Sequence, residues 1–341
     1  MKRILVTGGF GFIGSHLIEK LLAEGHAVHV VDNLSTNPLR VQTLMEELGY
    51  PRELSCNIYP AAQYCQMTRT QYDEIYHLAS PVGPAGVIPY AGQIVRQVVE
   101  DAYAVMGLAV RCKAKLVDVS TSEVYGGGQN GLCSETMPRV IQADTTARLE
   151  YAVAKLAAET AIVNMTRVNN DLKAVIIRPF NVAGPRQSGR GGFVAPRFVA
   201  QAMRDEPLTV FGDGSQVRAF THVKDIVNGL VLAMEQGKSG EAYNLGNPEN
   251  RTTILDLAKA VIRIVDGGSL SFTDGKTVYG EGYAEASDKF PDATKAKMDL
   301  DWKPEIGIDQ TIKDVWSYMM RYNRLEWLVP EDNIKSTLLH Q

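Results

Sequence analysis

The chain has 341 residues, more than the roughly 250–300 at which one hydrophobic core stops growing, so we expect two lobes or two domains. Hydrophobic residues make up 45% and charged residues 22%, proportions that exclude a disordered, collagen-like or disulfide-stapled chain. The net charge of −4 argues against nucleic acid as a partner, and no uncharged stretch reaches the roughly 20 apolar residues that crossing a membrane needs.

Strands and helices are predicted to alternate along the first half of the chain. Short runs of apolar residues favour buried strands at Ile4–Thr7, Ala27–Val31, Glu74–Leu78, Lys115–Val119 and Ala174–Arg178. Helical patterns occupy Phe12–Glu24, Gln93–Cys112 and Leu149–Val168. This alternation predicts right-handed βαβ crossovers, and so an α/β fold built on a Rossmann-type, doubly wound parallel sheet.

The pattern changes after Pro179, where a glycine-rich loop precedes a mixture of elements. Helices are predicted at Pro196–Arg204, Val223–Gln236, Ile254–Val265 and Ile308–Tyr322, and strands at Leu208–Phe211 and Ala242–Leu245. We therefore expect a Rossmann-type domain over residues 1–178 plus about 222–245, and a smaller mixed α/β domain over 179–221 and 246–330. Residues 331–341 are expected to form a tail.

A glycine-rich turn joins the first predicted strand to the first predicted helix. Gly8, Gly11 and Gly14 give the spacing G-x-x-G-x-x-G, which permits a tight turn and a close approach to a pyrophosphate, with Phe12 and Ile13 opening the helix. Asp32 ends the next strand, where a carboxylate would bind ribose hydroxyls and repel a 2′-phosphate. The alternative, a structural turn with a capping aspartate, is disfavoured by this βαβ context. The pattern predicts NAD as the cofactor.

Two further groups of residues suggest redox chemistry at a hydroxyl. Tyr151 and Lys155 lie four residues apart on one face of a predicted helix, so the ammonium would lower the pKa of the phenol and favour a phenolate base. This spacing alone is common on ordinary helices. Thr121, Ser122 and Glu123 follow a predicted strand, at the sheet edge where ligands bind, although a solvated loop would have the same composition.

Metal and disulfide chemistry are not indicated. The cysteines are Cys56, Cys65, Cys112 and Cys133. They form no C-x-x-C pair, no histidine follows them at zinc-site spacing, and the six histidines are scattered. We therefore expect no metal, reduced cysteines and a cytoplasmic location.

With these motifs the chain resembles the extended short-chain dehydrogenase/reductases that modify nucleotide-sugars, over nearly its whole length. The shared motifs are T-G-G-x-G-F-I-G at Thr7–Gly14, H-L-A at His77–Ala79, S-T-S-E-V-Y-G at Ser120–Gly126, Tyr151-x-x-x-Lys155, R-P-F-N-x-x-G-P-R at Arg178–Arg186, Asn244-Leu245-Gly246 and Pro291–Pro304.

The resemblance implies roles for individual residues. Thr121 and Tyr151 would hold the sugar C4 hydroxyl with Tyr151 as base, Lys155 would bind the nicotinamide ribose, and the sugar would become a 4-keto intermediate. Ser122 and Glu123 would complete the catalytic set. Further cofactor contacts are expected at Asn33, Asn57, Ile58, Leu78, Ala79 and Ser80, and substrate contacts at Pro81, Arg148, Asn181, Arg186, Arg218 and Lys289. The first domain would bind NAD and the second the nucleotide-sugar, and the helices at Gln93–Cys112 and Leu149–Val168 would form a homodimer interface.

The resemblance leaves the reaction after C4 oxidation open. Thr121-Ser122-Glu123 and Arg148, three residues before Tyr151, are similar to the UDP-glucuronate decarboxylases. A nucleotide-sugar 4-epimerase and a GDP-hexose 4,6-dehydratase remain alternatives, and a non-catalytic NAD-binding protein is a remote one. Arg148 and Glu123 could also form a simple surface pair. Asn57 and Lys289 stand where the family usually has an Asp and an Arg.

Overall fold

The computed structural model describes residues 1–35, 41–126, 131–141, 145–189, 192–280 and 288–322. The predicted tail and the last residues of the second predicted domain lie outside the described residues. No helix in these ranges has both the length and the apolar character needed to cross a bilayer.

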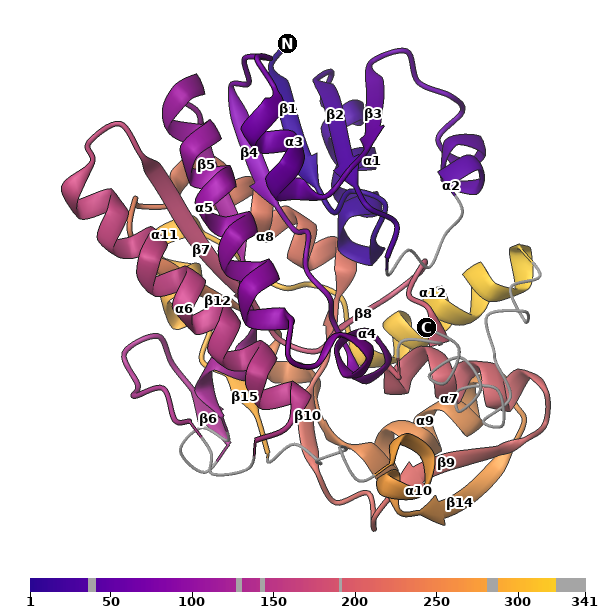
Figure 1. The fold of residues 1–341 in the computed structure, drawn as a ribbon. Coiled ribbons are helices and arrows are strands. Elements are labelled where there is room, and N and C mark those ends of the chain that lie inside the picture. Colours follow the sequence, from indigo (N-terminus) through magenta and orange to yellow (C-terminus); the bar gives the residue numbers. More distant parts are fainter. Residues whose placement is uncertain (36–40, 127–130, 142–144, 190–191, 281–287, 323–341) are drawn as a thin grey trace.

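A seven-stranded parallel sheet forms the centre of the molecule (Figure 1). Its strands are β1 (Arg3–Thr7), β2 (Ala27–Asp32), β3 (Leu54–Ile58), β4 (Glu74–His77), β5 (Lys115–Val119), β7 (Lys173–Pro179) and β12 (Ala242–Leu245). They lie in the order β12-β7-β5-β4-β1-β2-β3, which confirms the Rossmann-type, doubly wound α/β fold. The chain leaves β1 toward β3 and then crosses back to β4, so the switch in direction, where such folds bind ligands, lies between β1 and β4.

Helices cover both faces of this sheet (Figure 1). One face packs against α1 (Phe12–Ala23), α2 (Val41–Glu47), α8 (Val223–Gln236) and α11 (Thr294–Leu300). The other packs against α3 (Ala61–Met67), α5 (Ile94–Cys112) and α6 (Ala147–Val168). Because both faces are covered over most of the sheet, the strands other than β3 are largely apolar runs, which is why they could be recognised in the sequence.

A second apolar core lies beyond the carboxyl edge of the sheet. It is formed by α7 (Val194–Met203), α9 (Ile254–Val265), α12 (Ile308–Arg321) and the parallel strands β9 (Pro207–Phe211) and β14 (Ser269–Thr273). The short remaining elements are α4 (Pro84–Val87), α10 (Gly275–Tyr279), β6 (Leu132–Cys133), β8 (Val182–Ala183), β10 (Val217–Ala219), β11 (Thr221–His222), β13 (Arg251–Thr253), β15 (Phe290–Pro291) and the 3-10 turns η1 (Ile88–Tyr90), η2 (Ser122–Tyr125) and η4 (Pro248–Asn250).

Candidate active site

The glycine turn lies at the switch point of the sheet and is packed too closely for side chains. Gly8 has a φ of +69°, and a Cβ on it would lie 2.6 Å from the backbone nitrogen of Ala79 after β4. A Cβ on Gly14 would lie 2.4 Å from the carbonyl oxygen of Gly8. The first turn of α1 begins at Phe12 and continues through Ile13, and its N–H groups have no partners within the helix. This turn therefore fits a pyrophosphate.

Asp32 ends β2 beside this turn. Its Oδ2 accepts a hydrogen bond from the backbone N–H of Phe10 at 3.0 Å, and its Oδ1 accepts one from that of Leu34 at 2.8 Å. Burial raises the pKa of the carboxyl group, and the two hydrogen bonds oppose that shift. A carboxylate held in this way suits the ribose hydroxyls of NAD, so the turn and Asp32 together fit the dinucleotide.

The other predicted cofactor contacts lie at the ends of neighbouring strands. Asn33 follows β2, and its Oδ1 accepts from the backbone N–H of Ser35 at 3.0 Å. Asn57 and Ile58 end β3, and Ile58 pairs with Asp32 across the sheet. Leu78 follows β4 and donates its N–H to the carbonyl of Thr7 at 3.0 Å. All of these positions thus lie along the carboxyl edge of the sheet.

Tyr151 and Lys155 lie on the buried face of α6, as their spacing predicts. The Lys155 ammonium donates to the carbonyl oxygen of Val119 at the end of β5, at 2.8 Å. Burial raises the pKa of the Tyr151 phenol, and hydrogen bonds with Thr121 and Ser80 partly oppose the rise. The expected lowering of this pKa is therefore wrong for the described residues, because desolvation outweighs the neighbouring polar groups.

Contacts at several points of α6 fix its position. Near its start, Glu150 accepts hydrogen bonds from the backbone N–H groups of Gly92 at 2.6 Å and Ile94 at 2.9 Å, at the start of α5. Farther along, the buried pair of Glu159 with Arg178 of β7 has two hydrogen bonds of 2.9 and 2.6 Å. These contacts hold the helix against β7 and α5, so that Tyr151 faces Thr121.

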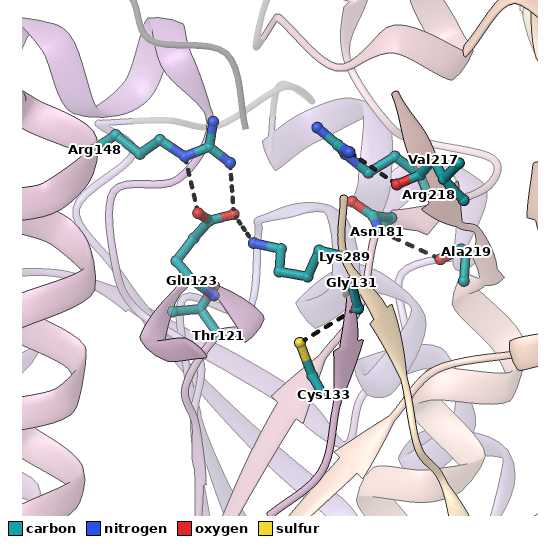
Figure 2. A network of polar contacts seen from close by, with 10 residues as sticks. All are labelled: Thr121, Glu123, Gly131, Cys133, Arg148, Asn181, Val217, Arg218, Ala219 and Lys289. Carbon is teal, nitrogen blue, oxygen red and sulfur yellow. Dashed lines mark hydrogen bonds and ion pairs between the residues drawn. The ribbon is translucent and has the colours of Figure 1, made fainter. Parts of the chain in front are cut away.

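The segment after β5 turns sharply into η2. The hydroxyl oxygen of Thr121 accepts from the backbone N–H of Glu123 at 3.2 Å, and Ser122 is buried. The Glu123 carboxylate then meets two cations (Figure 2). Arg148 donates to it from Nε at 2.9 Å and Nη2 at 3.0 Å, and Lys289 donates from Nζ at 2.6 Å. Arg148 and Glu123 therefore form a bidentate, partly buried ion pair and not a simple surface pair. Lys289 takes part in the same contact.

Charge dominates the ionisation of Glu123. Burial would raise the pKa of its carboxyl group, but Lys289 and Arg148 together hold that pKa well below its usual range. Lys289 is 1% exposed, and burial lowers the pKa of its ammonium, as do the charges of Arg148 and Arg218, against the attraction of Glu123. We call Glu123, Arg148, Lys289 and Arg218 the Glu123 cluster.

The Glu123 cluster joins the two parts of the chain. Arg148 comes from α6 and Glu123 from η2, whereas Arg218 lies on β10 and Lys289 pairs with Arg218 in an isolated parallel bridge. Figure 2 shows the Lys289 ammonium pointing at the Glu123 carboxylate, whereas Arg218 donates to the carbonyl of Val217 at 2.8 Å. The ammonium of Lys289, predicted as a substrate contact, therefore lies on a carboxylate of its own chain.

The remaining predicted substrate contacts divide into two groups. Asn181 follows β7 with a φ of +35°, and its Nδ2 donates to the carbonyl of Ala219 at 3.4 Å, near Arg218 (Figure 2). The carbonyl of Pro81 accepts from the hydroxyl of Ser80 at 3.3 Å. Arg186, in contrast, points toward α1 and α2.

The contacts of Arg186 differ from those expected of a residue that holds a diphosphate. Its guanidinium pairs with Glu19 of α1 at 2.7 Å and with Glu47 of α2 at 2.9 Å. It also donates to the backbone carbonyl of Ser15 at 3.3 Å. These partners favour a role in joining elements, since both carboxylates already neutralise its charge.

Sequence reasoning missed Asp118, a residue of β5 close enough to Lys155 for its charge to act on the ammonium. Asp118 is 2% exposed on β5, and its charge raises the pKa of Lys155 against the lowering caused by burial. Next to it, Nδ1 of His77 lies 2.7 Å from the hydroxyl oxygen of Thr7. A charged residue inside the apolar run Lys115–Val119 was the available signal, because unpaired buried carboxylates are rare.

Comparison with known proteins identifies the family. Residues 4–246 match the model of the NAD dependent epimerase/dehydratase family. The chain is 32% identical to the UDP-N-acetyl-alpha-D-glucosaminuronate decarboxylase of Bacillus cytotoxicus, over 92% of this chain and 96% of that protein. It is 34% identical to UDP-glucuronic acid decarboxylase 1 of Xenopus tropicalis, over 94% of this chain and 72% of that protein.

A solved structure is similar as well. The UDP-glucuronic acid 4-epimerase of Bacillus cereus, in complex with UDP-glucuronic acid and NAD, matches with a TM-score of 0.77 and 28% identity, over 94% of this chain and 99% of that one. Together with the glycine turn and Asp32, these similarities make NAD the cofactor. The chain belongs to the NAD dependent epimerase/dehydratase family of enzymes.

Proposed function

We propose that this protein is an NAD-dependent decarboxylase of a UDP-hexuronic acid, with UDP-glucuronate as the first substrate to test. The two relatives described above are decarboxylases of such sugars. Within the chain, the proposal rests on the Glu123 cluster.

The charge of the Glu123 cluster carries the proposal. Two cations, Arg148 and Lys289, pair with the Glu123 carboxylate, and Arg218 lies near enough to Lys289 for its charge to lower the pKa of the Lys289 ammonium. Basic side chains gathered at one place favour an anionic ligand. A nucleotide-hexuronic acid offers two anionic groups, its diphosphate and the carboxylate on C6, whereas a neutral sugar offers only the first.

The first chemical step is oxidation at C4. When bound, NAD accepts the hydride from C4 of the sugar. Tyr151 takes the proton of the C4 hydroxyl, and the hydroxyl of Thr121 donates a hydrogen bond to the same oxygen. Lys155, fixed on the carbonyl of Val119, supplies a positive charge that stabilises the Tyr151 phenolate while it exists.

Decarboxylation then follows from the position of the new ketone. The C4 ketone is β to the C6 carboxylate, so the C5–C6 bond breaks, carbon dioxide leaves and the electron pair moves onto the C4 oxygen. Tyr151, now protonated, and Thr121 hydrogen-bond to that oxyanion. A proton from solvent adds at C5, the hydride returns to C4, and Tyr151 gives its proton to the C4 oxygen, which yields a UDP-pentose. The cofactor ends the cycle in its starting form.

The second candidate is 4-epimerisation of the same uronic acid. The similarity to the Bacillus cereus 4-epimerase favours it, and it uses the same Tyr151, Thr121 and Lys155. The two reactions differ in whether the C5–C6 bond breaks before the hydride returns.

A substrate panel separates these candidates. The purified protein is incubated with NAD and, separately, with UDP-glucuronate, UDP-glucose, dTDP-glucose or GDP-mannose, and the products are analysed by mass spectrometry and chromatography. Loss of carbon dioxide from UDP-glucuronate supports the proposal. An isomer of unchanged mass supports the epimerase, and loss of water from a neutral sugar contradicts both.

We also propose that the part of the chain built on the seven-stranded sheet binds NAD. The part built on α7, α9 and α12 would bind the nucleotide-sugar. Two copies of the chain would associate through α5 and α6. Val95 and Tyr103 of α5 are exposed apolar side chains that such an interface would cover. Light scattering during size-exclusion chromatography tests the association, and a monomer at micromolar concentration would contradict it.

A further inference from the structure

A row of buried polar side chains crosses the sheet on the face that α5 and α6 cover. Thr7 of β1 pairs with His77 of β4, and His77 pairs with Asp118 of β5, so the three residues are neighbours across three strands. Side chains alternate along a strand, so Asp118 shares a face with Leu116, which packs in the core beneath α5 and α6. Asp118 is 2% exposed, as is His77. A carboxylate thus lies inside the sheet-helix layer.

Lys155 reaches the same layer from α6. Its ammonium donates at 2.8 Å to the carbonyl oxygen of Val119, the residue that follows Asp118. Lys155 is also 2% exposed, so the ammonium and the carboxylate are shielded from solvent together. Burial lowers the pKa of Lys155, and among the neighbouring charges Asp118 does most to raise it, followed by Asp101 and Glu159.

The two other acids that face this ammonium have structural partners, whereas Asp118 does not. Asp101 of α5 accepts a backbone N–H at the start of α3 at 2.8 Å, and Glu159 accepts two hydrogen bonds from Arg178. Oδ2 of Asp118 has no hydrogen-bond partner among the described residues, and Oδ1 lies 4.0 Å from Nε2 of His77, beyond a hydrogen bond. Because burying such a carboxylate costs free energy, packing does not explain Asp118.

Charge gives Asp118 a partner in Lys155. Burial lowers the pKa of His77 to about 3, so its ring is neutral and cannot balance the carboxylate. Burial raises the pKa of Asp118 to about 6 against the charge of Lys155, so the carboxyl group is ionised at neutral and alkaline pH. A buried carboxylate and a buried ammonium therefore favour each other's charged form.

We propose that Asp118 is the counter-ion of Lys155 and keeps its ammonium protonated when NAD, with its positively charged nicotinamide ring, is bound. The inference rests on the proposed role of Lys155 in oxidation at C4. Burial and a cofactor cation both favour the neutral amine, and a neutral amine would not stabilise the Tyr151 phenolate. Asp118 acts through Lys155, so it is a positioning residue.

Titration of Lys155 by NMR tests the proposal without substrate. The purified protein carries 13C at Cε of its lysines, and the Lys155 signal is identified by its loss in Lys155→Arg. In Asp118→Asn the midpoint of the Lys155 titration should fall by about one pH unit or more, a tenfold change in the protonation equilibrium. Asp118→Ser, which also removes the charge, should give a shift in the same direction.

Asp225→Asn is the matched control. Asp225 is a carboxylate of α8, on the opposite face of the sheet, and is 3% exposed. The amide oxygen of the variant can still accept from the backbone N–H of Ile306, as the carboxylate does. The midpoint of Lys155 should therefore stay within about 0.3 pH unit of the wild type, a twofold change.

The pH profile of turnover with UDP-glucuronate gives a second readout. Burial, Glu123 and Asp118 raise the pKa of the Tyr151 phenol, so removing the charge of Asp118 favours the phenolate at lower pH. Both limbs of the kcat profile of Asp118→Asn should therefore move to lower pH, the alkaline limb by about one unit. A merely structural role would lower kcat by the same factor at every pH.

The outcomes separate this inference from the proposed function. An unchanged Lys155 midpoint in Asp118→Asn and Asp118→Ser, or an equal shift in Asp225→Asn, would overturn the role of Asp118. Limbs of the kcat profile that stay in place would overturn it as well. A wild type that does not turn over UDP-glucuronate would contradict the proposed function, and the NMR titration would still decide whether Asp118 holds the charge of Lys155.

Discussion

Burial acts on Tyr151 and Glu123 with opposite net results. Desolvation and the negative charges of Glu123 and Asp118 raise the pKa of the Tyr151 phenol, against the hydrogen bonds of Thr121 and Ser80. The carboxyl group of Glu123 is also desolvated, but two cations contact it directly and lower its pKa. At neutral pH Glu123 is therefore ionised, and Tyr151 accepts the C4 proton only in the phenolate form that the positive charges of Lys155 and of bound NAD would stabilise. Glu123 thus acts as a fixed negative charge and not as a proton donor.

The variant Tyr151→Phe tests the role of the phenol. Removing one hydroxyl deletes the base at C4, so turnover should fall by about 10²–10⁴-fold. NAD binding should stay within about twofold, because Lys155 keeps its contact with the carbonyl of Val119. Turnover is followed with UDP-glucuronate, and bound NAD is measured on the same sample. Undiminished turnover would contradict the mechanism.

The variant Glu123→Gln tests the ionisation of the cluster. The folded-state pKa of Glu123 lies below the ordinary value of 4.5, so in acid the unfolded chain binds more protons. The stability that the cluster contributes is therefore complete above about pH 4.5 and is lost as the pH falls below it. Measured by urea unfolding across this pH range, the free energy of unfolding of Glu123→Gln should fall less on acidification than that of the wild type. Glu100→Gln, which removes an exposed pair with Arg96, is the control and should match the wild type.

Among the secondary-structure elements, those marked by a run or a regular spacing of apolar residues could be predicted from the sequence. Elements without such a pattern could not. The sheet strands other than β3 were predicted within a few residues, since they are apolar runs covered on both faces. β3 was missed because Ser55, Cys56 and Ile58 are exposed at the sheet edge and form no apolar run. The short elements α4 and η1, within Val82–Tyr90, were not predicted either.

The tight packing of α1 against the glycine turn gives a prediction at this scale. In Gly14→Ala the new methyl group would lie 2.4 Å from the Gly8 carbonyl oxygen, so the turn must shift, at a cost of about 1–3 kcal/mol. Gly107→Ala on α5 is the matched control. Its methyl group would meet only Arg111 at 3.6 Å, so helix propensity should leave it neutral or up to about 1 kcal/mol more stable. Chemical denaturation gives the free energy of unfolding of both variants. Equal changes in this free energy would contradict the tight packing of Gly14.

At the scale of the whole molecule, contacts between distant segments join the two cores. Arg186 precedes the second core and pairs with Glu47 of α2, and the hydroxyl of Tyr318 on α12 donates to the same carboxylate at 2.7 Å. Sequence spacing gave no sign of this, because 139 residues separate Arg186 from Glu47. For the same reason the contact of Lys289 with Glu123 could not be predicted. Motifs indicate which residues matter, but only the fold decides their partners.

Arg186→Gln should therefore destabilise the whole protein. Glu47 is 4% exposed, and removing its cation leaves a buried carboxylate without full compensation, at about 3–5 kcal/mol. The control Arg263→Gln breaks an exposed pair with Asp309 and should cost less than about 1 kcal/mol. Urea unfolding compares the two variants. A loss for Arg186→Gln no larger than that of the control would contradict a joining role.

We propose that the enzyme oxidises C4 of a UDP-hexuronic acid and then releases its C6 carboxylate as carbon dioxide. The most direct measurement is the yield of carbon dioxide from UDP-glucuronate in the presence of NAD, with absorbance at the NADH band recorded on the same reaction. We predict one carbon dioxide for each sugar consumed, no net accumulation of NADH, and neither product nor NADH with Tyr151→Phe. Consumption of the sugar by the wild type without carbon dioxide would contradict the claim.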